Sequence, residues 1–264
     1  MKRIKLVAAY DGTNYHGSQI QNNGETIEGV LQEALFALLQ EKITLIGASR
    51  TDAGVHARGN VFVFDTQSRI PPEKFTFALN ARLPEDIRIQ DSCEVPLDFH
   101  PRHQNTIKTY EYRILNRRLP LPEYRLYTHF TYETLDLEKM QEACGYFLGS
   151  HDFASFCAAG SQVESTVREI YDLHVKKDGD LWTISVTGNG FLYNMVRIIA
   201  GTLLKVGSGQ ILPGEIEQII CKKDRQLAGP TAPAKGLTLV EIRYPDYEKC
   251  QENLEKTEKI GIDN

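Results

Sequence analysis

The sequence predicts an α+β fold made of two similar halves, and three observations lead to that prediction. Some segments repeat apolar residues at helical spacing, and short runs rich in β-branched and aromatic residues, typical of strands, lie between them. The two kinds of segment follow the order β-α-β-β-α-β twice. The length of 264 residues, 41% of them hydrophobic, is sufficient for a core that serves both halves.

The first half is expected to contain four strands and two helices. Its strands are expected at residues 6–10, 43–46, 61–64 and from residue 87 to at least 89. Thr26 is an N-cap candidate for a helix over 27–38, where apolar residues recur every three or four positions. Pro71 introduces a weaker helix that ends before Pro84. The strand at 61–64 is apolar on both faces, which indicates that it is covered on both sides.

The second half repeats this order after a link around residues 96–105. Its strands are expected at residues 109–115, 171–175, 182–186 and 237–244. Its helices are expected at residues 137–148, 195–206 and 213–222, one more than in the first half. Lys177-Asp178-Gly179 predicts the tight turn of a hairpin between the two middle strands.

The repeated order is that of the ferredoxin-like split βαβ unit. We therefore expect a duplicated unit whose two sheets merge into one mostly antiparallel platform, with helices on one face. Residues from both halves would meet in a cleft between them. We assign residues 1–105 to the N-terminal half, 106–247 to the C-terminal half and 248–264 to a charged tail. The halves share no residue-level identity, so the repeat is one of architecture.

Composition narrows the class of protein. No run of about 18 apolar residues exists, so we expect no membrane span. The first five residues lead into an apolar block too short for a signal peptide, which favours a soluble, cytoplasmic protein. Five cysteines are scattered and form no CxxC pair, and seven histidines show no ligand spacing. We therefore expect no metal site.

Charge is distributed unevenly along the chain. The net charge of −5 and the isoelectric point near 5.8 argue against a nucleic-acid partner when averaged over all residues. However, residues 99–125 carry six Lys or Arg against two Glu, and the last twenty residues supply much of the acidity. On charge alone, a solvated basic face is the favoured interpretation of that stretch.

A polar segment, residues 47–57, connects the expected strands at 43–46 and 61–64. It places Asp52 at a strand end, with the guanidinium of Arg50 two residues earlier and the small pair Ala53-Gly54 directly after. An ionised carboxylate that another molecule can approach suits a nucleophile or a general base. Ordinary turn chemistry with a solvated Arg50–Asp52 ion pair explains the same spacing, and on spacing alone it is favoured.

The string of residues adds information that spacing does not. Arg50-Thr51-Asp52-Ala53-Gly54-Val55-His56 resembles the catalytic motif of the tRNA pseudouridine synthase A (TruA) family. Further matches lie along most of the chain, at Tyr10-Asp11-Gly12-Thr13, Gly17, Gln19, Gln21, Phe99-His100, Arg102, Tyr110-Glu111-Tyr112, Asp152-Phe153, Ser155-Phe156, Gly190-Phe191, Met195-Val196-Arg197, Gly236-Leu237 and Leu239. Three positions depart from the family pattern, namely Ser18, Ser49 and Asn194.

The resemblance implies the roles of the catalytic groups. Asp52 is the expected nucleophile, Arg197 its ion-pair partner and Tyr110 the aromatic residue in contact with the target base. Arg50 would help the base leave its stack, and Leu237 would line the pocket.

The resemblance also implies a substrate and an assembly. A cofactor-independent isomerase would convert uridine to pseudouridine at positions 38, 39 and 40 of the tRNA anticodon stem-loop, as a homodimer whose subunits both contact one tRNA. With RNA as the partner, the basic stretch from Arg102 to Arg125 gains weight as a phosphate contact, and Arg102 is a candidate substrate-binding residue.

Two other functions compete with this expectation. A non-catalytic ferredoxin-like RNA-binding module is suggested by residues 58–63, a faint echo of an RNA-recognition motif, but Asn60 and Asp65 stand where that motif stacks bases. An acid/base hydrolase would use Asp52 with His56 on a small substrate, and no second motif supports it. Pseudouridine formation is the expectation that gives Asp52 a role and accounts for the other matches.

Overall fold

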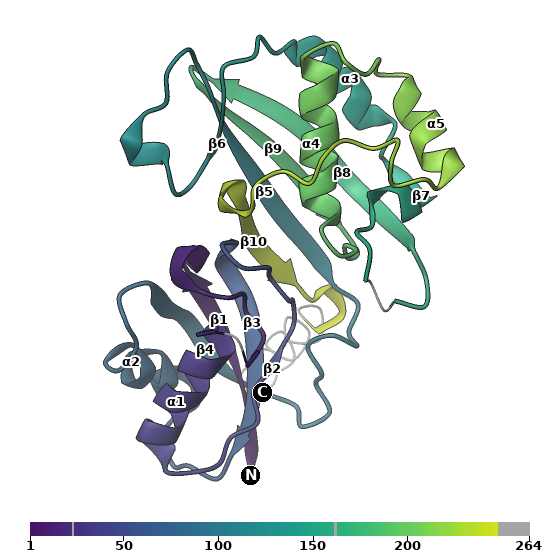
Figure 1. Ribbon diagram of the computed structural model, residues 1–264. Coiled ribbons are helices and arrows are strands. Elements are labelled where there is room, and N and C mark those ends of the chain that lie inside the picture. The colour runs from purple at the N-terminus through teal and green to yellow at the C-terminus, as the bar shows by residue number, and fades with distance from the viewer. Residues whose placement is uncertain (23, 161–162, 248–264) are drawn as a thin grey trace, which may run out of the picture.

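The computed structural model describes residues 1–22, 24–160 and 163–247. Within them the chain forms one mixed sheet in the order β4-β1-β3-β10-β5-β9-β8-β7, with β2 paired to β3 and β6 to β5. Figure 1 shows this sheet running through both halves of the molecule, with helices packed beside each half. The expected charged tail, residues 248–264, lies outside the described residues.

The N-terminal half pairs its strands antiparallel. Its strands are β1 (Lys2–Tyr10), β2 (Ile46–Gly47), β3 (His56–Thr66) and β4 (Ile87–Val95). Its helices are α1 (Ile27–Leu39) and α2 (Phe75–Asn80). The Thr26 side chain accepts a hydrogen bond from the Gly29 N–H, so the expected N-cap of α1 is confirmed.

The C-terminal half supplies the rest of the sheet. Its strands are β5 (Ile107–Asn116), β6 (His129–Thr131), β7 (Gly149–Asp152), β8 (Val167–Asp178), β9 (Leu181–Gly188) and β10 (Leu237–Arg243). Its helices are α3 (Leu137–Gly145), α4 (Met195–Gly207) and α5 (Glu215–Lys222). Short 3-10 turns occur at Gly12–Asn14, Pro72–Lys74, Pro122–Tyr124, Ala154–Phe156 and Ala234–Gly236.

Strand β10 joins the two halves. It pairs parallel with β3, where Thr238 lies opposite His56, and antiparallel with β5, where Leu239 lies opposite Tyr110. The other strand pairs are antiparallel except for β5 with β6. The α+β class and the mostly antiparallel sheet are therefore confirmed, whereas the division at residues 105 and 247 stays a prediction.

Some expected strands differ from the observed ones. The strand expected at 43–46 is reduced to Ile46–Gly47, because only these two residues pair with β3. Leu45 is buried nevertheless, so its apolar character serves packing rather than a sheet ladder. The short strands β6 and β7 were not expected. Their sequences, His-Phe-Thr and Gly-Ser-His-Asp, carry no clear apolar alternation.

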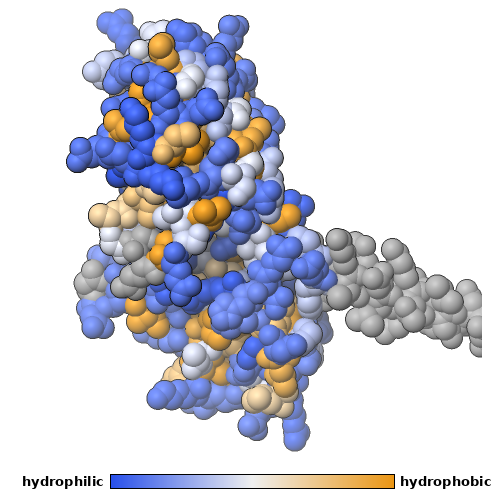
Figure 2. Space-filling view, turned by 90° about the vertical axis from the view of Figure 1, so that its right-hand side faces the viewer, coloured by the Kyte–Doolittle hydropathy of each residue, from blue (hydrophilic) through white to orange (hydrophobic). Residues whose placement is uncertain are grey.

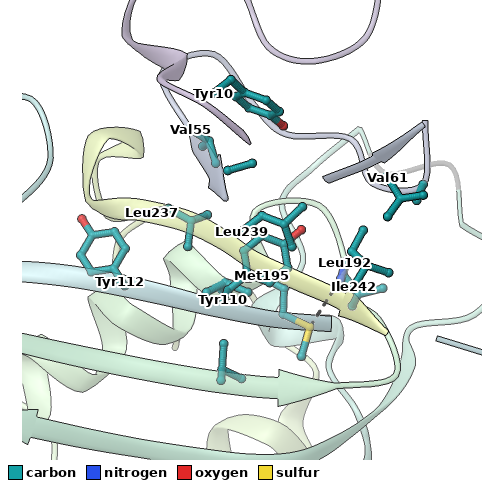
Figure 3. Packing of buried hydrophobic residues seen from close by; sticks show 14 of the residues in the cluster. Tyr10, Val55, Val61, Tyr110, Tyr112, Leu192, Met195, Leu237, Leu239 and Ile242 are labelled. Carbon is teal, nitrogen blue, oxygen red and sulfur yellow. Dashed lines mark hydrogen bonds between the residues drawn. The ribbon is translucent and has the colours of Figure 1, made fainter. Parts of the chain in front are cut away.

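One cluster of buried residues extends through both halves. Figure 3 shows its central part, where Tyr10 and Val55 of the N-terminal half face Leu237 and Leu239 of β10. Tyr110 and Met195 lie beneath them on the side of β5 and α4. Because packed interiors resist deformation, this shared core fixes the two halves relative to each other at the level of the expected cleft.

A segment preceding β10 crosses helix α4 at very close range. A Cβ atom at Gly201 of α4 would lie 1.9 Å from the carbonyl oxygen of Pro230. The Gly229 N–H donates a 2.8 Å hydrogen bond to Oγ1 of buried Thr202. The glycine is therefore required by the close approach, and the crossing segment reaches Ala232, next to Arg197, from this point.

We expect Gly201→Ala to lower the free energy of unfolding by about 1–3 kcal/mol, because the added methyl group forces the crossing segment away from α4. Gly145→Ala is the matched control, since no atom lies within 4 Å of a Cβ placed at Gly145. Chemical denaturation of both variants measures the difference. Equal stability of the two variants would contradict the close crossing.

Candidate active site

The motif loop, residues 48–55, turns sharply between β2 and β3. The Ala48 N–H donates to the carbonyl oxygen of Val61 at 2.7 Å, which ties the start of the loop to β3. The Val55 N–H donates to the carbonyl oxygen of Asp52 at 3.1 Å, and Gly54 has a φ angle of +76°. A side chain at position 54 would be strained in that conformation, so glycine permits the turn that presents Asp52.

A buried hydrogen-bond network supports the loop from below. Asn60 of β3 is fully buried, and its Nδ2 donates to Tyr10 Oη at 3.1 Å and to the Ser49 carbonyl oxygen at 3.0 Å. The Tyr10 hydroxyl in turn shares a 2.8 Å hydrogen bond with Thr51 Oγ1. Burial raises the pKa of Tyr10, so its hydroxyl stays protonated within this network.

The segment after β1 holds the loop from the other side. The Thr51 N–H donates to Ser18 Oγ at 2.8 Å, and the Ser18 N–H donates to the Thr51 carbonyl oxygen at 3.0 Å. Gly17 has a φ angle of +91°, and a Cβ there would lie 2.7 Å from the same carbonyl oxygen. Both backbone groups of Thr51 are therefore fixed directly before Asp52.

Asp52 forms an ion pair with Arg197 of α4. Arg197 Nη1 lies 2.9 Å from Asp52 Oδ2. The same nitrogen donates to Asn194 Oδ1 at 2.7 Å, and Nε donates to the Ala232 carbonyl oxygen at 2.7 Å. No described residue donates a hydrogen bond to Asp52 Oδ1, and the side chain is 29% exposed. One carboxylate oxygen is thus held while the other remains accessible.

Tyr110 of β5 and Leu237 of β10 form an apolar wall close to the carboxylate. Both residues are buried, and the Tyr110 ring lies edge-on to Phe191 with centroids 5.3 Å apart. The Tyr110 hydroxyl shares a 2.9 Å hydrogen bond with Ser49 Oγ. Burial, aided by the negative charge of Asp52, raises the pKa of Tyr110 to about 12. The phenol therefore remains protonated near neutral pH.

These groups line a groove of about 1050 Å³ to which both halves contribute. Cationic side chains line it as well, namely Arg50, Arg102, Lys108 and Arg197. Arg102 Nε donates to the Gly47 carbonyl oxygen at 2.7 Å. Figure 2, which faces the right-hand side of Figure 1, shows mostly hydrophilic residues on that face, with apolar residues in small patches. A polar or charged partner suits such a surface.

Comparison with known proteins agrees with this geometry. The family model described as tRNA pseudouridine synthase matches residues 6–104 and 143–245. The "tRNA pseudouridine synthase A" of Ruminiclostridium cellulolyticum is 51% identical over 245 residues, and that of Acetivibrio thermocellus is 48% identical over 244 residues. The "tRNA pseudouridine synthase A 2" of Clostridium perfringens is 47% identical over 244 residues. Each match covers 92% of this chain and 100% of the relative.

The chain belongs to the tRNA pseudouridine synthase family.

All six residues singled out from the sequence as site residues line this one groove. They are Arg50, Asp52, Arg102, Tyr110, Arg197 and Leu237. The expected ion pair between Asp52 and Arg197 is present, whereas the alternative pair between Arg50 and Asp52 is not: no described carboxylate forms an ion pair with Arg50. Arg50 is exposed at the edge of the groove, where its charge acts on Arg102 and Glu28. The catalytic roles themselves stay predictions.

The geometry counts against both competing functions. His56 Nδ1 accepts from the Gly12 N–H at 3.2 Å, and Nε2 lies 3.1 and 3.2 Å from the carbonyl oxygens of Leu126 and Lys235. Because both ring nitrogens are engaged there, His56 is a structural residue and no partner for Asp52. Asn60 and Phe62 are buried, so residues 58–63 present no platform for stacked bases. A pseudouridine synthase site is consistent with the same residues.

Several residues of the site were given no individual role from the sequence, although Lys108 belongs to the basic stretch expected to contact phosphates. Ser49, Lys108, Phe191 and Asn194 line the groove. Asn60 supports the motif loop through the Ser49 carbonyl oxygen. A polar residue inside an otherwise apolar strand, as with Asn60, indicates a buried hydrogen bond. Lys108 lies two positions before Tyr110 on a strand, which places both on one face. The contacts of Ser49 and Asn194 depend on tertiary neighbours and carry no local signal.

Within residues 1–22, 24–160 and 163–247, no three or more His, Cys, Asp or Glu side chains come close enough to hold a metal ion. In the same part of the chain, the helices are too short or too polar to cross a membrane.

We expect Asn60→Ala to lower the free energy of unfolding by about 1–3 kcal/mol, because the Ser49 carbonyl oxygen and the Tyr10 hydroxyl lose a buried donor. Exposed Asn105, which makes no side-chain hydrogen bond among the described residues, supplies the control Asn105→Ala. Thermal and urea unfolding of both variants test the network. An Asn60→Ala protein as stable as the control would show that the network does not support the loop.

Proposed function

We propose that this chain isomerises uridine to pseudouridine in tRNA. The observation that carries the proposal is the Asp52–Arg197 ion pair, which lies in an open groove beside Tyr110 and Leu237. Membership of the tRNA pseudouridine synthase family supports the same activity. Three cations of the groove, Arg50, Arg102 and Lys108, form no ion pair with another described residue, which suits an RNA backbone better than a neutral small molecule.

The reaction breaks the bond between N1 and C1′, turns the uracil and joins C5 to C1′. The proton on C5 is lost and N1 gains one, so no redox partner is required. Asp52 can act on the sugar in two ways: its accessible oxygen attacks or stabilises electron-poor C1′, or it assists proton removal at C2′. In both routes Arg197 holds the other oxygen of the carboxylate and fixes its direction.

The detached uracil must stay in place while it turns. Tyr110, Phe191 and Leu237 supply apolar surface that excludes water and confines the base. The Tyr110 hydroxyl, protonated near neutral pH and bonded to Ser49, is positioned to relay the proton that leaves C5.

The target uridine has to leave the helical stack before it reaches Asp52. Eversion costs a few kcal/mol, and a side chain that fills the vacated space lowers that cost. Arg50 is exposed at the groove edge and lies two residues from Asp52, so we assign it this role. Arg102, which lines the same groove, is assigned to the RNA backbone.

The finer features of the reaction follow the family resemblance. The substrate would be the anticodon stem-loop, with uridines 38, 39 and 40 as targets. The enzyme would act in the cytoplasm as a homodimer whose subunits both contact one tRNA.

Asp52→Ala and Asp52→Asn are expected to reduce pseudouridine formation by about 10⁴-fold or more, because neither side chain is a nucleophile or a base. Asp178→Asn, an exposed change of equal charge at the end of β8, should leave the rate unchanged. Carbodiimide mapping of unmodified tRNA after incubation measures product and its position. Product from Asp52→Ala at the wild-type rate would end the assignment.

Tyr110→Phe is expected to lower the single-turnover rate by about 10²-fold or more, because the relay for the C5 proton is removed. Ser49→Ala is the matched variant, since it removes the 2.9 Å hydrogen bond but keeps the phenol. Rapid-quench measurement of product compares the single-turnover rates of Tyr110→Phe and Ser49→Ala. Full turnover by Tyr110→Phe would exclude the hydroxyl from proton transfer.

A further inference from the structure

Lys108 is a half-buried cation in the groove that the reaction as described does not use. Its Nζ donates to the Ala48 carbonyl oxygen at 3.2 Å. A lysine ammonium has three donors, and no described residue accepts a hydrogen bond from the other two. Among the ion pairs of the described residues, none includes Lys108. Burying an ammonium without a counter-charge is unfavourable, so an anion from outside the chain would stabilise this arrangement.

The position of Lys108 connects it to the catalytic groups. It lies two residues before Tyr110 on β5, so both side chains leave the same face about 7 Å apart. Its register partner on β9 is Gly188, which adds no side chain beside it. The ammonium therefore faces the groove next to the phenol that contacts the base.

Lys108 and Arg102 both hold the start of the motif loop. Arg102 Nε donates to the carbonyl oxygen of Gly47, and Lys108 Nζ donates to that of Ala48. Two adjacent carbonyl groups, directly before Ser49, are thus bonded to two cations that line the groove. An anion bound between these cations would contact the backbone support of Asp52.

The electrostatic surroundings of Lys108 are positive. Burial, together with the charges of Arg102 and Arg168, lowers the pKa of Lys108 to about 8. The charged or titratable side chains that line the groove around it are His16, Arg50, Asp52, Arg102, Tyr110, Tyr193 and Arg197. Asp52 is the one carboxylate in this set and is already paired with Arg197. The local excess of positive charge favours a bound anion.

We propose that Lys108 and Arg102 form a phosphate-binding subsite that takes a backbone phosphodiester flanking the target uridine. This inference rests on the proposed function, because an RNA substrate brings one such anion per nucleotide. Uracil itself is neutral and needs no ammonium. A bound phosphodiester would place the everted nucleotide against Tyr110 and would hold the loop that carries Asp52.

The first test removes the negative charge of one phosphate of the RNA and leaves the protein unchanged. Anticodon stem-loops carry one methylphosphonate linkage, either 5′ or 3′ of the target uridine. The preceding nucleotide is 2′-O-methylated in these RNAs and in the phosphodiester controls alike. For the wild type, we expect one of the two linkages to lower the affinity and the single-turnover rate by about tenfold to hundredfold. If both methylphosphonate RNAs have the same affinity and single-turnover rate as their phosphodiester controls, the proposal is overturned.

The second test combines that RNA with Lys108→Met. With phosphodiester RNA, this variant should show about the same loss of affinity and single-turnover rate as the wild type shows with the sensitive methylphosphonate RNA. When the variant is combined with that methylphosphonate RNA, affinity and rate should fall little further. A purely structural role for Lys108 predicts instead that the two losses multiply. The wild-type comparison needs no variant, so it remains decisive even where Lys108→Met folds poorly.

Lys108→Arg supplies a rescue and a pH signature. The protonated ammonium binds phosphate, so wild-type affinity should be full well below pH 8 and fall as the pH rises from 7 to 9. Arginine keeps its charge over this range, so Lys108→Arg should retain affinity and show a flatter profile. Identical profiles for the two proteins would contradict the assignment.

The outcomes separate the subsite from the reaction. If the wild type binds tRNA but forms no pseudouridine, the proposed reaction fails. The subsite is then tested by the salt dependence of binding, which Lys108→Met should weaken by about one phosphate contact. An unchanged slope rejects the subsite, and absence of tRNA binding rejects both proposals.

Discussion

The ion pair between Asp52 and Arg197 is the contact on which the rest of the site depends. Its partners come from opposite halves, 145 residues apart in sequence. A partly buried pair gains little unless further hydrogen bonds hold its geometry. Those bonds come from Asn194 and from the Ala232 carbonyl oxygen, and the latter reaches Arg197 only because the chain crosses α4 at Gly201. The glycine crossing is thus part of the architecture of the active site.

The polar network below the motif loop fixes the carboxylate from the other half. A catalytic group displaced by about 1 Å loses much of its effect, so a turn held only by packing would be too loose. Asn60 places three hydrogen-bonding groups inside the core, where each would be costly if unpaired. Because all three are paired, the network favours one loop conformation. The same burial that makes Asn60 structural removes the base-stacking surface of a simple RNA-binding sheet.

Short sequence patterns predicted individual helices and turns, but they did not predict which strands pair across the sheet. The helix after Thr26 and the hairpin at Lys177-Asp178-Gly179 follow from spacing and turn chemistry, and both are found. The insertion of β10 between β3 and β5 depends on register across the whole chain, which no window of residues contains. Asp52 was identified by the resemblance of its motif, since spacing alone favoured an ordinary turn. Lys108 was included only as one of six cations in a basic stretch, because its lack of a nearby carboxylate is visible only in the folded chain.

The net charge of the chain is a poor guide to whether it binds RNA, because some of its cations form ion pairs and those of the groove mostly do not. Away from the groove, several arginines form ion pairs, as Arg3 does with Asp65 and Arg58 with Glu111. In the groove, Arg50, Arg102 and Lys108 have no such ion pair within the described residues. A chain with a net charge of −5 can therefore present a positive wall to RNA, since attraction is set by the local field within about a Debye length. The surplus of acidic residues elsewhere opposes the approach of RNA to other faces, which favours the groove that contains Asp52.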